Sequence, residues 1–89
     1  MATKPNGKLK RIVETTQFQR EKTDFLAEDG GLALALTAAV FLLERAPERG
    51  QRAPWTDIWA LPTTLGVTIY YKFEGETVTL LSLQRCHLL

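Results

Sequence analysis

Apolar and polar residues change their spacing twice along this chain, from alternating to helical and back to alternating. The first segment, KLKRIVET over residues 8–15, alternates when it is extended and carries β-branched residues at its centre, so it predicts a strand. Beyond it Phe18, Phe25 and Leu26 recur at helical spacing, which predicts a short amphipathic helix.

The predicted boundaries of this helix rest on two local signals. Thr16 is followed three residues later by Gln19, the spacing of a capping box, which indicates that the helix begins there. The stretch EDGG over residues 28–31 ends it, since Gly30 or Gly31 can take the left-handed conformation that closes a helix.

A second and more apolar helix is predicted over residues 32–43, before Pro47 and Gly50 stop it. One stripe at helical spacing is formed by Leu32, Ala35, Leu36, Ala39, Val40 and Leu43. Leu34, Phe41 and Leu42 add apolar surface on other faces. We therefore expect this helix either to lie between the sheet and the first helix or to be covered in part by a partner chain.

The C-terminal half returns to alternation and predicts three strands. WTDIWAL over residues 55–61 is a strand that Pro62 ends, and residues 66–83 form a hairpin whose turn is EGE. On its first arm Val67, Ile69, Tyr71 and Phe73 share one face, and Thr68, Tyr70 and Lys72 share the other. The last strand is apolar on both faces near its end, which places it inside the sheet.

These elements predict an α+β fold, a small antiparallel sheet with the two helices of the N-terminal half packed on one face, in the order β-α-α-β-β-β. The hairpin is expected at the centre of the sheet. Eighty-nine residues are enough for a single domain, residues 1–89, in which we expect residues 1–7 to be flexible.

Composition narrows the class of protein. A hydrophobic fraction of 45% and a charged fraction of 24% are ordinary for a folded soluble chain. The longest uncharged apolar run, residues 30–43, is shorter than the ~20 residues of a membrane span. No secretory signal is visible, so we expect a cytoplasmic protein without membrane contact. The single cysteine, Cys86, has no Cys or His partner at zinc spacing, and we expect neither metal nor cofactor.

Charge gives only local support for nucleic-acid binding. Eleven basic and ten acidic side chains leave a net charge of +1, which exerts little attraction on phosphate. Candidate nucleic-acid contacts are the basic residues of two clusters and of the hairpin: Lys8, Lys10, Arg11, Arg49, Arg52 and Lys72. The alternative is a solubilising tail and a favourable positive helix end. Trp55 and Trp59 either stack on bases or a partner or, as is commoner beside a strand, pack at the core or the edge of the sheet.

Several segments together resemble the RelE/ParE superfamily of toxins from bacterial type II toxin–antitoxin modules. They are KRIVET leading to FQREKTDFL, the long apolar helix with P-x-x-G after it, IWALP, and VTIYYKFEGETVTLLSLQR, which together cover nearly the whole chain. RelE-like members cleave mRNA in the ribosomal A site, and ParE-like members poison DNA gyrase. The resemblance therefore implies a growth-arresting toxin, most simply a metal-independent ribosome-dependent endoribonuclease, neutralised by an antitoxin that wraps it with an extended or helical segment.

Two departures keep other functions open. Members commonly carry an arginine near the start of the hairpin strand, where this chain has residues 67–69, VTI, and the usual basic C-terminal extension is reduced to CHLL. Both departures, with the near-neutral charge, favour a non-catalytic binding protein on the same scaffold. A ParE-like inhibitor of gyrase lies between the two classes because it needs a complementary surface and no acid or base. A homodimer is a further possibility.

A nuclease on this scaffold has few candidate catalytic residues. Cleaving RNA through its 2′-hydroxyl needs a base, an acid and a cation for the developing charge. His87 is the only histidine and becomes the acid or base, with Arg85 as phosphate clamp and Tyr70 or Lys72 in support. The alternative is that His87 lies in a frayed terminus and Tyr70 packs in the core.

Overall fold

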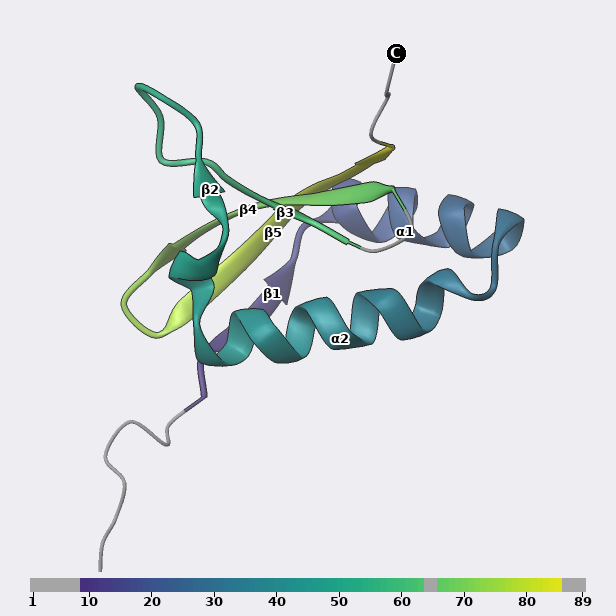
Figure 1. Ribbon diagram of the computed structural model, residues 1–89, viewed down its shortest axis with the longest axis horizontal. Helices are drawn as coiled ribbons and strands as arrows, with labels where there is room; N and C mark the ends of the chain where they lie inside the picture. The colour runs from purple at the N-terminus through teal and green to yellow at the C-terminus, as the bar shows by residue number, and fades with distance from the viewer. Residues whose placement is uncertain (1–8, 64–65, 86–89) are drawn as a thin grey trace, which may run out of the picture.

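The computed structural model describes residues 9–63 and 66–85 (Figure 1). The segment expected to be flexible, residues 1–7, lies outside these ranges, as do the predicted site residues Lys8 and His87.

The described residues form an α+β fold in the predicted order, with one additional short strand. The elements are β1 (Arg11–Glu14), α1 (Thr16–Glu28), α2 (Leu32–Arg45), η2 (Pro47–Arg49), β2 (Gln51–Arg52), β3 (Trp59–Pro62), β4 (Val67–Glu74) and β5 (Thr77–Arg85). β2 lies between the second predicted helix and the strand predicted from residue 55, in a stretch for which no element is predicted. β3 ends at Pro62 as predicted but begins at Trp59, because residues 55–58 belong to a hydrogen-bonded turn and not to the strand.

The five strands form one sheet in the order β1-β5-β4-β3-β2. The β4–β5 hairpin occupies its centre, as predicted, and neighbouring strands from β5 to β2 are antiparallel. β1 runs parallel to β5, so the sheet is mixed and not wholly antiparallel. Parallel partners need a long crossover, and here both helices and three strands lie between the two in sequence.

Both helices contribute to a single core on one face of the sheet. Figure 1 shows α2 running along the sheet and α1 beside the C-terminal half of β5. The core consists of Phe18, Leu32, Leu36, Ala39 and Leu43 from the helices and Val67, Ile69, Tyr71, Val78, Leu80 and Leu83 from the sheet. The predicted inward face of β4 is thus confirmed.

A β-bulge in β5 changes which side chains of that strand face the core. Tyr70 pairs with Ser82 while the next residue, Tyr71, pairs with Leu80, so Leu81 is an extra residue without a partner on β4. Strict alternation would put Leu83 on the face opposite Leu80. The bulge returns Leu83 to the core, where it is 1% exposed.

The start of α1 lies one residue before the predicted cap. Thr15, not Thr16, is the N-cap: its Oγ1 accepts a hydrogen bond from the Phe18 amide at 3.2 Å. The same hydroxyl donates to the Leu80 carbonyl at 2.9 Å, so one side chain fixes both the helix start and its place on β5. Thr16, which lacks this second contact, is exposed in the first turn.

The turn between the helices contains no left-handed glycine. Gly31 has φ −66° and leads directly into α2, so the predicted left-handed closure by Gly30 or Gly31 is wrong. Asp29 serves instead, since its carboxylate accepts the Gly31 amide at 2.9 Å. The described glycines with positive φ are Gly66 and Gly75, the latter at the tip of the predicted hairpin turn.

Glu21 fastens α1 to the part of β5 that β1 does not cover. Its Oε1 accepts hydrogen bonds from the Leu83 amide at 2.8 Å and from the Ser82 hydroxyl at 3.0 Å. Partial burial alone would raise the pKa of Glu21, but these bonds and one from Gln17 outweigh it, and the pKa is lowered. The carboxylate therefore accepts the backbone hydrogen bond that a neighbouring strand would accept if β1 extended this far.

Glu21→Gln is expected to lower the free energy of unfolding by about 1 kcal/mol at pH 7, because the amide keeps the shape but loses the charge-assisted bonds. A group with a depressed folded pKa stabilises the fold above its unfolded pKa of about 4.3, and this contribution disappears as pH falls through the folded value. Urea unfolding of both proteins will show a difference at pH 7 that narrows below about pH 4. Asp24→Asn, on the exposed side of α1, is the matched control, and equal losses in both variants would contradict the assignment.

Candidate functional site

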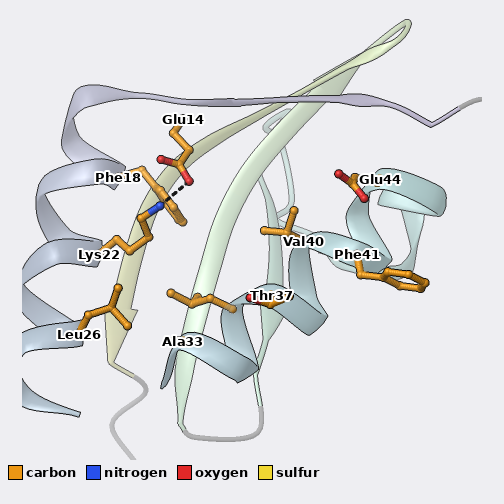
Figure 2. A pocket seen from close by; sticks show the side chains of 10 residues that line it. Glu14, Phe18, Lys22, Leu26, Ala33, Thr37, Val40, Phe41 and Glu44 are labelled. Carbon is orange, nitrogen blue, oxygen red and sulfur yellow. Dashed lines mark hydrogen bonds and ion pairs between the residues drawn. The ribbon is translucent and has the colours of Figure 1, made fainter. Parts of the chain in front are cut away.

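An open apolar groove of about 390 Å³ lies between the two helices and is bounded at one end by Glu14 of β1 (Figure 2). It is lined by Glu14, Phe18, Lys22, Leu26, Ala33, Leu36, Thr37, Val40, Phe41 and Glu44. Figure 2 shows the α1 side chains on one wall and those of α2 on the other. Most of the surface that lines the groove is apolar.

The groove stays open because the two helices are attached to different parts of the sheet. Thr15 and Glu21 hold α1 against β5. The far end of α2 is bonded to the segment before β1, where the Lys10 amide donates to the Glu44 carbonyl at 2.8 Å. Phe18 fills the floor between them and is 1% exposed. The walls above it remain partly open to solvent.

Charged side chains stand at the rim of this apolar groove. Lys22 Nζ lies 2.7 Å from Glu14 Oε2 on one side, the ion pair drawn in Figure 2. Glu44 stands on the other side and pairs with Arg45 at 3.3 Å. An apolar centre within a charged rim is the composition of a protein-binding surface.

Exposed apolar side chains extend along α2 beyond the groove. Phe41 is 56% exposed and its ring lies 3.4 Å from the Arg45 guanidinium carbon, while Leu34 is 79% exposed. The described part of the chain therefore leaves Leu34 and Phe41 on α2 uncovered, whereas Leu42 is half-buried beside β3. Of the two expectations for this helix, partial covering by a partner chain is the one these exposed side chains favour.

The fold does not bring the predicted catalytic residues Arg85 and Tyr70 together. Arg85 is opposite Val67, on the helix side, where its guanidinium is 3.0 Å from Glu28 and lies over the Phe25 ring. Tyr70 is one residue out of phase with Tyr71, so it faces the other side of the sheet. β5 extends to Arg85, two residues beyond the predicted end of the hairpin, but the two side chains lie on opposite faces.

The predicted nucleic-acid contacts within the described residues fall into two separate groups. Arg11 and Lys72 lie on the same open face as Tyr70, opposite Thr77 and Thr79, and Lys10 Nζ donates to the Gly75 carbonyl at 3.0 Å. Arg49 and Arg52 lie near the other edge of the sheet, in η2 and β2. They do not form one continuous basic surface.

The two tryptophans have different environments. Trp59 packs on the core, with its ring centroid 5.1 Å from that of Phe73. Trp55 is 90% exposed, so the expectation of core or edge packing holds for Trp59 and is wrong for Trp55. The physical reason is the turn before β3, which carries Trp55 away from the sheet.

Within the described ranges, no three His, Cys, Asp or Glu side chains come close enough together to hold a metal ion. Nor is any of the described helices both long and apolar enough to span a bilayer.

Comparison with solved structures identifies the fold. A chain of the chromosomal ParDE TA system from P. aeruginosa superposes with a TM-score of 0.70 at 10% identity, over 91% of this chain and 100% of that chain. The conserved hypothetical protein HP0894 from Helicobacter pylori gives a TM-score of 0.58 at 15% identity, over 86% and 94%. No protein-family profile and no curated protein matches the sequence. At these identities the likeness shows the fold alone, and the α+β fold predicted from the sequence is the one that these solved chains share.

Proposed function

We propose that this chain is the toxin of a bacterial toxin–antitoxin pair, and that it arrests growth by inhibiting DNA gyrase until an antitoxin binds it. The observation that carries the proposal is the unfilled apolar groove between α1 and α2 on a fold shared with a chain of a ParDE TA system. A groove of this kind accepts an amphipathic helix or an extended apolar segment. Charges beside the bound segment would be complementary to the charged residues at the rim of the groove, which are Glu14, Lys22 and Glu44.

Inhibition of a protein target is favoured over RNA cleavage by the placement of the charged groups. Arg85, the proposed phosphate clamp, is already paired with Glu28 and stacked on Phe25. Tyr70 faces the other side of the sheet and has no access to the same substrate atom. A toxin that blocks an enzyme by binding needs a complementary surface and no acid/base set.

Ribosome-dependent mRNA cleavage is the second candidate, because Tyr70, Lys72 and Arg11 share the open face of the sheet. Such a face combines cations for phosphate with a phenol able to exchange a proton. This candidate does not require Arg85 on the helix side.

The variant Tyr70→Phe/Arg85→Ala separates the two candidates. We expect it to arrest growth as the unmodified toxin does, within about twofold, since neither side chain belongs to a protein-binding surface on the proposed account. The exposed Arg85–Glu28 pair contributes little stability, so the variant should fold. Growth after induction, with pulse-labelling of DNA synthesis and of translation, is the measurement. Loss of arrest in a soluble, folded variant would favour mRNA cleavage instead.

A further inference from the structure

A large aromatic side chain stands alone at the tip of the turn between β2 and β3. Trp55 is 90% exposed, more than the other exposed large hydrophobic residues in the described part of the chain. Figure 1 shows this turn projecting beyond the sheet. We call residues 53–58 the Trp55 loop.

The Trp55 loop is held in one conformation by its own hydrogen bonds. The Ala53 amide donates to the Ile58 carbonyl at 2.8 Å, and Thr56 Oγ1 donates to the Ala53 carbonyl at 3.1 Å while accepting the Ile58 amide at 3.0 Å. Arg52 closes the base by donating to the Thr56 carbonyl at 3.2 Å. A loop whose backbone is ordered in this way loses less backbone conformational entropy when its side chain is bound.

The backbone at Trp55 is unfavourable for a tryptophan. Its φ of 65° lies in the left-handed region, which Gly and Asn adopt readily and bulky residues avoid. The indole gains nothing from the core at 90% exposure. Folding alone therefore favours Gly or Asn at this position, and what the indole contributes must come from contacts outside the chain.

Charge favours a protein over a nucleic acid as the partner of this loop. The segment from residue 48 to residue 57 contains Glu48 and Asp57 against Arg49 and Arg52, which leaves no net charge. Binding to nucleic acid depends on neutralising several phosphates, which this segment cannot do. An exposed tryptophan near exposed arginines is instead the composition of a hot spot at protein interfaces.

The Trp55 loop lies at the opposite edge of the sheet from the helix groove. It connects β2 and β3, while the groove is bounded by β1, and these strands occupy the two ends of the order β1-β5-β4-β3-β2. We propose that the Trp55 loop is the surface that binds the toxin's target protein, with the indole inserted into an apolar pocket of that protein. This inference rests on the proposed function. The antitoxin groove and the target contact are then two separate surfaces.

The test uses substitutions that suit the backbone, so that misfolding does not account for a loss of function. Trp55→Asn and Trp55→Gly fit the left-handed conformation and should keep or raise thermal stability. Binding of the full chain to purified DNA gyrase, measured by surface plasmon resonance, should weaken by roughly 30-fold or more, the loss typical of a hot-spot residue. Growth arrest should be lost with it, and Trp55→Phe should retain part of both. Val13→Thr changes another exposed apolar side chain, on β1 and outside the helix groove, and should change neither.

The outcomes separate this inference from the proposed function. If the unmodified chain arrests growth and binds gyrase, and Trp55→Asn does so equally well, the Trp55 loop is not the target contact and the proposed function stands. If the unmodified chain neither arrests growth nor binds gyrase, the proposed function fails and the inference fails with it. Binding to a short oligouridylate that is lost in Trp55→Asn, with gyrase binding unchanged, would overturn the protein partner in favour of a nucleic acid.

Discussion

On the proposed function, a glutamate in place of Ala33 will abolish neutralisation by an antitoxin while leaving growth arrest intact. Ala33 is exposed on α2 and lines the helix groove, so the free chain tolerates the larger side chain in water. Once an apolar segment fills the groove, the new carboxylate is covered without a designed partner. Burying an unpaired charge is costly enough to weaken binding by roughly 100-fold or more.

Ala38→Glu is the matched control for this prediction. Ala38 is also exposed on α2, but it lines a smaller apolar hollow beside Leu61 and Pro62 of β3 and not the helix groove. The measurement is growth during co-expression with an antitoxin that suppresses arrest by the unmodified chain, followed by the dissociation constant of the purified pair. Full neutralisation of Ala33→Glu together with loss in Ala38→Glu would place the antitoxin on the β3 side instead.

Gly50→Ala will destabilise the fold by about 3 kcal/mol, through overpacking and a lost buried hydrogen bond. A Cβ at Gly50 would collide with the Tyr71 hydroxyl and come within 2.8 Å of the Ala60 carbonyl oxygen. Tyr71 is completely buried and donates to the Pro47 carbonyl at 2.5 Å, and burial raises the pKa of its phenol. Contacts this short cannot persist, so the Tyr71 hydroxyl bond breaks or β3 moves.

Thermal unfolding measures this effect directly. A loss of about 3 kcal/mol in a domain of this size lowers Tm by roughly 12 to 24 °C. Gly30→Ala is the control, because a Cβ there meets no atom within 4 Å, and its Tm should stay close to that of the unmodified protein. A Gly50→Ala variant that melts with the control would contradict the tight packing of Gly50 against Tyr71.

Local patterns in the sequence were sufficient for most of the fold. Alternation along β4 correctly predicts which side chains enter the core, because the period of two holds over all the residues concerned. The bulge at Leu81 was not predictable, since an extra residue is defined only by the partner strand. The parallel pairing of β1 with β5 likewise depends on a contact between segments far apart in sequence, which no local period encodes.

The candidate site was less accessible to sequence analysis than the fold. Val40 was expected in the apolar stripe of α2, and Leu26 in that of α1, but a groove is the space left between two helices, and spacing within each helix does not define it. The grouping of Arg85 and Tyr70 in one catalytic site relies on the chemistry of their side chains and not on the face that each occupies. Which face each occupies depends on the register, and the register separates them. Trp55 is exposed because it lies in a turn where its own backbone is left-handed. No glycine or asparagine in the sequence of this turn indicates that conformation.

Induction of this chain alone in a bacterial culture, with parallel pulse-labelling of DNA synthesis and of translation, tests the central claim most directly. The account predicts growth arrest in which DNA synthesis fails while translation initially continues, and recovery when the antitoxin is co-expressed. Undisturbed growth with the chain soluble and abundant would contradict the assignment as a toxin.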